Sequence, residues 1–119
     1  MNEPRRIRVL LTGGAGFLGQ RVTAELRDMA RGRGTAVHVR CLDLEPCSVA
    51  DESIVADLTD ARIVDRAARD TDVIVHAAAM IDWGNTPRSR VFDVNVGGTR
   101  HIIGAGRRHG VKAVVYTGT

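Results

Sequence analysis

The sequence has 119 residues, of which 44% are hydrophobic and 26% charged, and its formal net charge is +3 at pH 7. This length allows one domain with a real core, but it is short for a complete cofactor-dependent enzyme. Because no apolar run approaches the roughly 18 residues of a membrane helix, no signal-peptide pattern is present and only 3% of the residues are aromatic, we expect a cytoplasmic protein without a membrane span or a nucleic-acid partner.

Apolar runs of strand length alternate with segments of helical period in the first half of the chain. We predict strands over residues 7–12 and 53–56, and between them a longer strand that ends at Asp43. Residues 17–30 have the pattern of an amphipathic helix. Its predicted apolar stripe comprises Leu18, Val22, Leu26 and Met29.

The alternation continues through the second half. A helix capped by Thr59 or Asp60 precedes a strongly apolar strand over residues 72–79. Pro87 suits the first turn of a further helix, and residues 113–119 form the last predicted strand. The stripe of that further helix is predicted to comprise Val91, Val94, Gly98, Ile102 and Ala105. Strands that alternate with helices are typical of an α/β domain with a parallel sheet, and no linker or repeat divides the chain, so we assign a single domain.

Three glycines follow the first predicted strand in the pattern Gly13-x-x-Gly16-x-x-Gly19. They lie between a strand and a helix, so the unpaired N–H groups of that helix point at whatever lies beyond the strand. Gly13 permits a tight turn, Gly16 lets a pyrophosphate lie against the backbone at the positive end of the helix dipole, and Gly19 lets the helix pack closely. The alternative is an ordinary strand-to-helix turn, but three glycines in this register would weaken the helix for no reason.

Two carboxylates follow strands on the same side of the predicted sheet. Asp43 lies 24 residues after Gly19, where a carboxylate accepts both hydroxyls of an adenosine ribose and repels a 2′-phosphate, which favours NAD over NADP. Asp57 follows the short third strand at the carboxyl edge of the sheet, where open α/β folds bind their ligands. The alternatives are a solvated carboxylate for Asp43 and a cap of the following helix for Asp57.

Three other side chains that often carry chemistry have simpler interpretations. His76 lies within an apolar strand, so a hydrogen-bonded core histidine is favoured over a catalytic one. Cys41 and Cys47 lack the spacing of a zinc or redox site. We therefore expect free thiols and no bound metal.

Five segments carry a family resemblance, in the order TGGAGFLG, ADLTD, VIVHAAA, FDVNVGGTRHII and AVVYTGT. Together they resemble the extended short-chain dehydrogenase/reductase superfamily, which contains the NAD-dependent epimerases and dehydratases. The segment HAAAMIDWG resembles the 3β-hydroxysteroid dehydrogenase branch more than the sugar-nucleotide epimerases. The resemblance implies a Rossmann-type, doubly wound parallel sheet with strand order 3-2-1-4-5, an NAD(P)-binding domain over residues 1–119, and NAD as the cofactor.

The resemblance also implies roles for particular residues. The pyrophosphate would lie on the glycine turn, with Asp43 at the ribose and with Asp57 and the Leu58 backbone at the adenine ring. Asn95 would fix the region after the fourth strand through side-chain hydrogen bonds, and Thr119 would be the catalytic hydroxyl that orients the substrate oxygen. The cofactor-binding set implied in this way comprises Gly13, Gly16, Phe17, Leu18, Gly19, Asp43, Asp57, Leu58, Ala77, Ala78, Ala79 and Asn95.

The loop after the fourth strand, residues 80–83, would border the substrate. Three of its side chains, Met80, Ile81 and Trp83, suit an apolar substrate, whereas Asp82 does not. The alternative for Trp83 is that it merely covers the neighbouring helix.

The family's catalytic Tyr-x-x-x-Lys lies downstream of the fifth strand, and the sequence ends before it; Tyr116 has no lysine four positions later. We therefore expect the N-terminal, cofactor-binding half of an NAD-dependent oxidoreductase, inactive by itself. Its expected substrate is a sterol-like or other apolar hydroxyl or keto compound, and a homodimer is one possible assembly of the complete enzyme. Two alternatives stay open: an NAD-dependent nucleotide-sugar epimerase or dehydratase, and a non-catalytic NAD-binding module.

Overall fold

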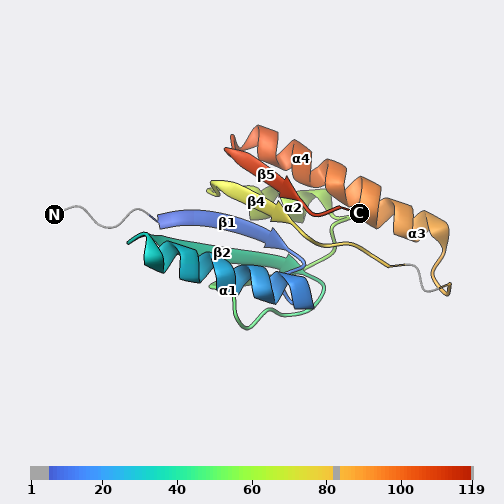
Figure 1. The fold of residues 1–119 in the computed structure, drawn as a ribbon. Helices are drawn as coiled ribbons and strands as arrows, with labels where there is room; N and C mark the ends of the chain where they lie inside the picture. The colour runs from blue at the N-terminus through green and yellow to red at the C-terminus, as the bar shows by residue number, and fades with distance from the viewer. Residues whose placement is uncertain (1–5, 82–83, 119) are drawn as a thin grey trace.

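The protein forms a five-stranded parallel sheet with helices on both faces, and a computed structural model describes its residues 6–81 and 84–118 (Figure 1). The strand order is β3-β2-β1-β4-β5, which confirms the predicted Rossmann-type α/β fold. The strands are β1 (Arg6–Thr12), β2 (Ala36–Asp43), β3 (Glu52–Val55), β4 (Val73–His76) and β5 (Ala113–Tyr116). The helical segments are α1 (Phe17–Gly32), α2 (Ala61–Ala68), α3 (Arg88–Phe92), the π-helical turn η1 (Asp93–Gly97) and α4 (Gly98–Arg108).

Side chains alternate between the two faces of the sheet, and each face has its own core. The first core joins the sheet to α2 and α4, and its largest members are Leu10, Leu42, Val64, Ile74 and Ile102. The second core joins the sheet to α1, and its buried members are Val9, Leu11, Val39 and Val75. This alternation places residue 12 on the α2/α4 face and residue 43 on the α1 face, so the strand ends present side chains to both sides.

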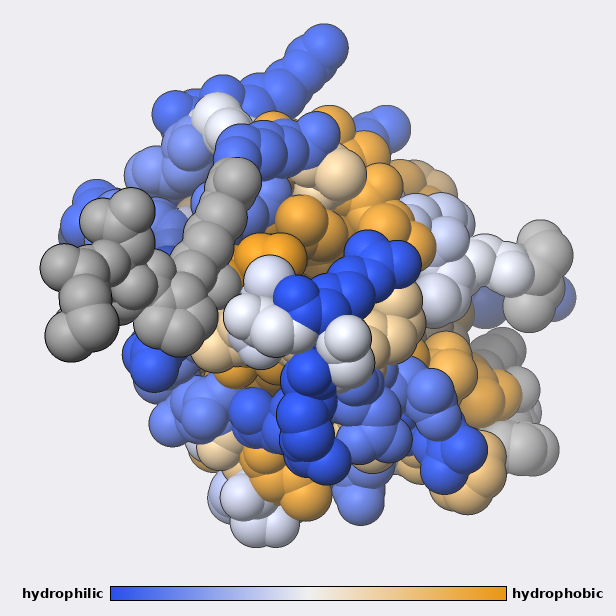
Figure 2. Space-filling view, turned by 60° about the vertical axis from the view of Figure 1, so that its left-hand side comes forward, coloured by the Kyte–Doolittle hydropathy of each residue, from blue (hydrophilic) through white to orange (hydrophobic). Residues whose placement is uncertain are grey.

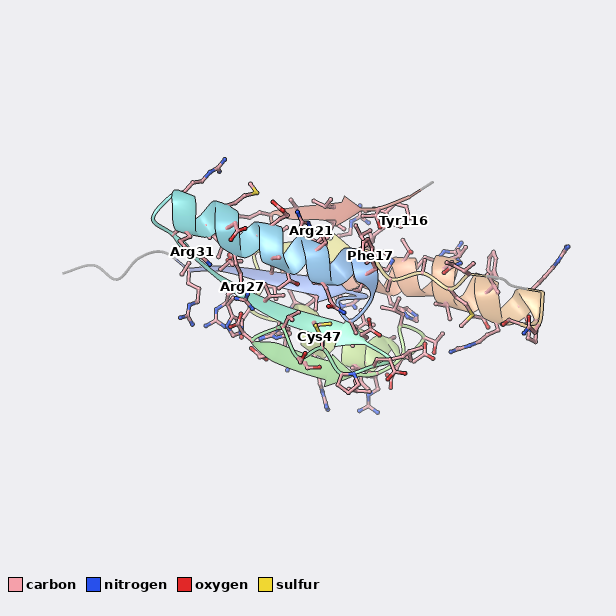
Figure 3. All side chains as sticks on the ribbon, turned by 60° about the horizontal axis from the view of Figure 1, so that its bottom comes forward. Phe17, Arg21, Arg27, Arg31, Cys47 and Tyr116 are labelled. Atoms are coloured by element: carbon pink, nitrogen blue, oxygen red, sulfur yellow. The ribbon has the colours of Figure 1, made fainter. Side chains whose placement is uncertain are left out.

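Helix α1 follows the predicted stripe only in its middle. Val22 and Leu26 pack on the second core, but Leu18 is 49% exposed and Met29 52% exposed, so the prediction is wrong at both ends. The buried residues of the helix are instead Gly19, Thr23 and Ala30. Figure 3 shows α1 lying along the strands of the sheet.

Strand β5 is exposed along its whole described length. Its side chains Val115 and Tyr116 are 51% and 60% exposed. Strand β5 lies in the upper half of Figure 1. The upper half of Figure 2 shows a patch of hydrophobic surface among hydrophilic side chains. The described part of the chain therefore leaves apolar surface open beside β4 and β5.

The ends of the elements correct several predicted boundaries. Strand β4 ends at His76 rather than at residue 79. Beyond it, the Ala77 N–H donates to both the carbonyl and the hydroxyl oxygen of Thr12, and the Ala78 N–H donates to the Thr12 hydroxyl oxygen. The cap of α2 is Asp60, whose Oδ1 accepts from the N–H groups of Arg62 and Ile63 at 3.1 and 3.3 Å. None of the described helices is long and apolar enough to cross a membrane.

The single helix predicted from Pro87 onward is divided by the π-helical turn η1. A π-helical turn adds one residue to the helical repeat, so it rotates the residues before it relative to those after it. Val94, Gly98, Ile102 and Ala105 are buried as predicted, but Val91 is only half-buried.

Candidate functional site

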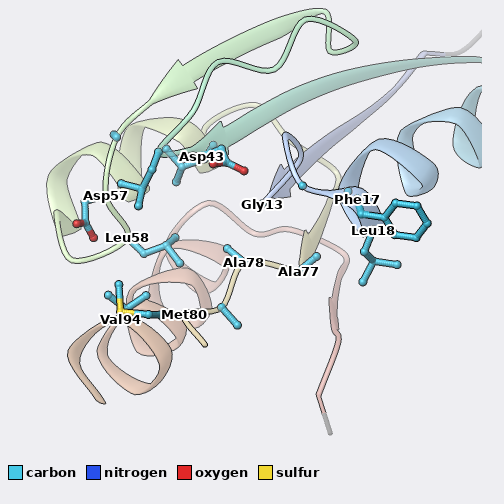
Figure 4. A pocket seen from close by; sticks show the side chains of 16 residues that line it. Gly13, Phe17, Leu18, Asp43, Asp57, Leu58, Ala77, Ala78, Met80 and Val94 are labelled. Atoms are coloured by element: carbon cyan, nitrogen blue, oxygen red, sulfur yellow. The ribbon is translucent and has the colours of Figure 1, made fainter. Parts of the chain in front are cut away.

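A cavity of about 420 Å³ lies at the carboxyl ends of β1, β2 and β4 (Figure 4). All residues of the predicted cofactor-binding set except Asn95 line it, namely Gly13, Gly16, Phe17, Leu18, Gly19, Asp43, Asp57, Leu58, Ala77, Ala78 and Ala79. The remaining lining residues, which that set did not include, are Leu42, Leu44, Ala56, Met80 and Val94. Segments far apart in the sequence therefore meet at one edge of the sheet, where open α/β folds hold their ligands.

Two of the three glycines in the turn are required by the protein itself. Gly13 has φ +76°, and a Cβ there would lie 2.9 Å from the backbone N and Cα of Ala78. A Cβ at Gly19 would overlap the carbonyl oxygen of Gly13. The turn, the start of α1 and the segment after β4 therefore touch through their backbones, which only glycine permits.

Gly16 is different, because nothing in the described structure requires a glycine there. Its φ is −76°, and a Cβ would meet only the Gly13 carbonyl oxygen at 3.5 Å, an ordinary contact. The residue is exposed, lines the cavity and precedes α1, whose N-terminus has no side-chain cap. An uncapped helix N-terminus attracts an anion. Open space beside it, kept free of a side chain, fits a phosphate group of a ligand.

Asp43 connects the end of β2 to the glycine turn. Its Oδ2 accepts from the Ala15 N–H at 3.1 Å, and its Oδ1 accepts from the Glu45 N–H at 3.0 Å. The side chain is half-buried and lines the cavity, so it is not the freely solvated carboxylate of the alternative interpretation. Each carboxylate oxygen accepts two hydrogen bonds, so both oxygens retain capacity for a ligand hydroxyl.

Asp57 is held by the turn before α2 and by α3. Its Oδ1 accepts from the N–H and hydroxyl of Thr59, both at 3.0 Å, and its Oδ2 accepts from Arg90 Nη2 at 2.5 Å. Burial by itself would raise the pKa of Asp57, but the hydrogen bonds from Arg90 and Thr59 outweigh it, so that pKa lies below its ordinary value. Asp57 is thus an ionised, oriented carboxylate at the cavity, and Asp60 is the helix cap.

Leu58 is fixed from behind by α4. A Cβ at Gly98 would lie 2.8 Å from the Leu58 Cβ, so the glycine lets the helix approach the leucine closely. His101 Nδ1 lies 2.8 Å from the Leu58 carbonyl oxygen and donates to it. The Leu58 side chain is buried and lines the cavity beside Val94.

The segment after β4 forms the opposite wall and is held by two side chains. The Thr12 hydroxyl oxygen accepts from the N–H groups of Ala77 and Ala78, both at 3.1 Å. Asn95 Oδ1 accepts from the Met80 N–H at 2.7 Å, and Asn95 Nδ2 donates to the Met80 carbonyl at 2.9 Å. Asn95 therefore lies behind the wall rather than in the cavity.

The two cysteines lie beneath the glycine turn. Both are buried free thiols, as predicted, and the Cys47 thiol donates to the Gly14 carbonyl oxygen at 3.3 Å (Figure 3). Burial, with Cys47 as a close neighbour, raises the pKa of Cys41 to about 12. A thiol in this state is a packing residue and a poor nucleophile.

Four residues with predicted roles remain to be placed. Ile81 is 63% exposed beyond the β4 wall, whereas Asp82, Trp83 and the predicted catalytic Thr119 lie outside the described residues. The part of the chain that the structure describes contains no group of three or more His, Cys, Asp or Glu side chains able to hold a metal ion.

Comparison with known proteins agrees with this geometry. The model of the 3-beta hydroxysteroid dehydrogenase/isomerase family matches residues 10–119. A 3 beta-hydroxysteroid dehydrogenase/Delta 5-->4-isomerase of Mycobacterium tuberculosis is 40% identical over 92% of this chain and 31% of its own length. The human 3 beta-hydroxysteroid dehydrogenase type 7 is 30% identical over 97% of this chain and 33% of its own length. The chain thus spans about a third of the length of these curated relatives.

Solved structures show the same relationship. A short-chain dehydrogenase/reductase superfamily protein from Agrobacterium tumefaciens with bound NAD is 34% identical, with a TM-score of 0.78 over 92% of this chain and 31% of that one. A UDP-glucose-4-epimerase from Stenotrophomonas maltophila with bound NAD is 25% identical, with a TM-score of 0.76 over 92% of this chain and 36% of that one.

Proposed function

This chain belongs to the 3-beta hydroxysteroid dehydrogenase/isomerase family, and from that premise we propose that it is the NAD-binding domain of an NAD-dependent oxidoreductase. When bound, NAD supplies the carbon centre that accepts or donates a hydride. The contribution of this chain is to bind and orient the dinucleotide at the carboxyl edge of its sheet.

The observation that carries the proposal is the space at Gly16. The fold requires glycine at positions 13 and 19 but not at position 16, and that residue faces the cavity in front of an uncapped helix N-terminus. A pyrophosphate placed there accepts hydrogen bonds from the free N–H groups of the first turn of α1 and lies at the positive end of its dipole.

The other cavity residues contact the adenosine and nicotinamide halves of the dinucleotide. On one side of the pyrophosphate, Asp43 accepts the adenosine ribose hydroxyls, and Asp57 with the Leu58 backbone meets the adenine ring. On the other side, the small residues Ala77, Ala78 and Ala79 leave room for the nicotinamide half. A carboxylate at the ribose repels a 2′-phosphate, so the domain prefers NAD to NADP.

For the substrate, we propose an apolar compound with a hydroxyl or keto group, such as a sterol. Met80 lines the cavity beyond the alanine wall, and Ile81 follows it with an exposed side chain, which together give this side an apolar border. The names of the mycobacterial and human relatives support the same class. Thr119 is proposed as the hydroxyl that orients the substrate oxygen.

A second candidate is an NAD-dependent epimerase or dehydratase of nucleotide sugars. It is favoured by the solved neighbours, which include the UDP-glucose-4-epimerase described above and a dTDP-glucose 4,6-dehydratase from Streptomyces venezuelae at 29% identity and a TM-score of 0.75. Both candidates use the same cofactor cavity. A domain that binds NAD without catalysis is the third.

The experiment that tests the proposal is calorimetric titration of the 119-residue chain with NAD, in the wild type and in Gly16→Val. The valine side chain takes the space of the pyrophosphate and removes its hydrogen bonds to charged oxygens, so we expect a loss of about 100-fold in affinity. Gly32→Val is the matched control, because Gly32 lies at the other end of α1 and a Cβ there meets nothing within 4 Å. A folded Gly16→Val protein that binds NAD as well as the wild type refutes the pyrophosphate site.

A further inference from the structure

A continuous chain of hydrogen bonds crosses the interior behind the cavity, and His76 is at its centre. The ring of His76, only 2% exposed, has its Nδ1 2.7 Å from Thr12 Oγ1 and its Nε2 2.9 Å from Thr99 Oγ1. The Thr99 hydroxyl donates to the Asn95 carbonyl oxygen at 2.6 Å. Asn95 in turn binds both backbone groups of Met80. The chain therefore runs from the residue before the glycine turn to the last residue of the opposite wall.

The directions of these bonds define one proton arrangement. The single proton of the Thr99 hydroxyl goes to the Asn95 carbonyl, so Thr99 Oγ1 accepts from His76 Nε2–H. The Thr12 oxygen already accepts from the N–H groups of Ala77 and Ala78, which uses both of its lone pairs. Its proton therefore goes to His76 Nδ1, which must be bare. The imidazole is neutral, with its proton on Nε2.

We propose that His76, in this neutral form, is a positioning residue for the nicotinamide half of the cofactor. This proposal rests on the proposed function. His76 orients the Thr12 hydroxyl so that its oxygen faces Ala77 and Ala78, and those two N–H groups set the position of the wall beside Gly13. Because Gly13 lies in backbone contact with Ala78, a small displacement of this wall changes the width of the cavity at that point.

A second proton on His76 breaks this arrangement. A proton on Nδ1 would face the Thr12 hydroxyl oxygen, which has no lone pair left, so that oxygen must give up its bond from Ala77 or Ala78. The Ala77 N–H also donates to the Thr12 carbonyl oxygen at 3.2 Å, so the Ala78 N–H depends more on the hydroxyl. Among the described residues, β1 and α4 present the hydroxyls of Thr12 and Thr99 to the ring, and β5 presents the ring of Tyr116, whose centroid lies 5.6 Å from that of His76. Burial lowers the pKa of His76 below its ordinary value of 6.5. The neutral ring thus persists at neutral pH and is lost only in more acidic solution.

The test compares NAD with ADP-ribose, which lacks the nicotinamide ring, as ligands of the 119-residue chain. Thr12→Val removes the hydroxyl, and we expect it to reduce NAD affinity about tenfold, the effect of one or two lost hydrogen bonds, with ADP-ribose affinity changed less than about twofold. Thr12→Ser, which restores the hydroxyl, is expected to recover NAD affinity. Thr71→Val is the matched control, since Thr71 is a buried threonine whose hydroxyl binds the Ala68 carbonyl at 2.7 Å, away from the cavity.

A second measurement needs no substitution. Nitrogen-15 NMR of labelled histidine in the wild-type chain at pH 7 is expected to show one imidazole with a bare Nδ1 and a protonated Nε2. The ratio of NAD to ADP-ribose affinity is expected to decrease as the pH falls below 6.5. If Thr12→Val loses affinity for NAD and for ADP-ribose equally, or if the His76 ring is protonated at Nδ1 at pH 7, the positioning role is overturned while NAD binding stays in place. A wild-type chain that binds neither ligand overturns the proposed function and this inference with it.

Discussion

The clearest prediction from the cavity concerns the charge of Asp43. Its two described hydrogen bonds come from neutral backbone N–H groups, and among the described residues no ion pair joins the carboxylate to a cation. Asp43→Asn keeps the shape and one acceptor oxygen but removes that charge. The substitution therefore separates the effect of charge on cofactor choice from the effect of shape.

The size of the preference for NAD over NADP follows from the distance between the Asp43 carboxylate and a phosphate on the ribose. A carboxylate about 4 Å from one phosphate charge is repelled by about 1 kcal/mol in a water-like dielectric and by about 4 kcal/mol at an effective dielectric constant of 20. The half-buried position of Asp43 lies between these limits, so we expect the wild type to prefer NAD by about 1–3 kcal/mol, or about 5- to 150-fold.

Calorimetric titration with NAD and NADP measures the two affinities directly. In Asp43→Asn we expect the preference to fall to within about threefold, and NAD affinity to fall by about tenfold because a charge-assisted hydrogen bond to the ribose becomes a neutral one. Asp28→Asn, an exposed residue of α1 paired with Arg31, is the control and should change neither. A wild type that binds NADP as tightly as NAD, or an Asp43→Asn protein with an unchanged preference, refutes the assignment.

Three further predictions concern the frame around the cavity. Gly19→Ala should lower the melting temperature, because its Cβ would overlap the Gly13 carbonyl; a thermal scan showing wild-type stability would contradict the backbone contact. Asp60→Ala should lower the free energy of unfolding by about 1 kcal/mol through loss of the α2 cap, measured by urea denaturation, whereas an unchanged midpoint would mean that the cap contributes nothing. Cys41 and Cys47 should react with a thiol reagent only after unfolding, because both are buried and the pKa of Cys41 is raised to about 12; rapid modification of the native protein at pH 8 would contradict that burial.

The elements of the fold were predictable because their signals are local. Apolar runs and helical periods predict the strands and helices and a parallel sheet, whereas the strand order followed from the family resemblance. The glycine turn was predictable for a similar reason, since a strand followed by closely spaced glycines and a helix admits few backbone paths. The structure adds which glycine serves which purpose: Gly13 and Gly19 meet the protein's own backbone, and Gly16 does not.

The sequence patterns mispredict the structure where contacts between distant parts of the chain determine it. Leu18 and Met29 fit the helical period, but both side chains are exposed, and the residues buried beside them in α1 are Gly19 and Ala30. Likewise, the run after His76 is apolar enough for a strand. The N–H groups of Ala77 and Ala78 nevertheless bind the Thr12 hydroxyl oxygen, and Ala77 also binds the Thr12 carbonyl oxygen. Thr12 lies 65 residues before Ala77, and no local sequence pattern predicts that contact.

The supporting side chains of the site were the hardest to predict. Arg90 lies in a polar segment with no distinguishing pattern, and its pairing with Asp57 joins positions 33 residues apart. His76 was predicted as a hydrogen-bonded core residue, and the structure gives partners to both ring nitrogens. Only the fold shows that these partners connect two walls of the cavity.

We propose that the cavity at the carboxyl edge of the sheet binds NAD through the glycine turn. Nitrogen-15 NMR of the 119-residue chain during titration with NAD tests it residue by residue. We predict that the largest amide shifts occur at Gly13 to Gly19, with further shifts at Asp43, Leu58 and Ala78, and that β3 and the C-terminal end of α1 change little. Shifts confined to other surfaces, or an unchanged spectrum at millimolar NAD, would refute NAD binding at the glycine turn.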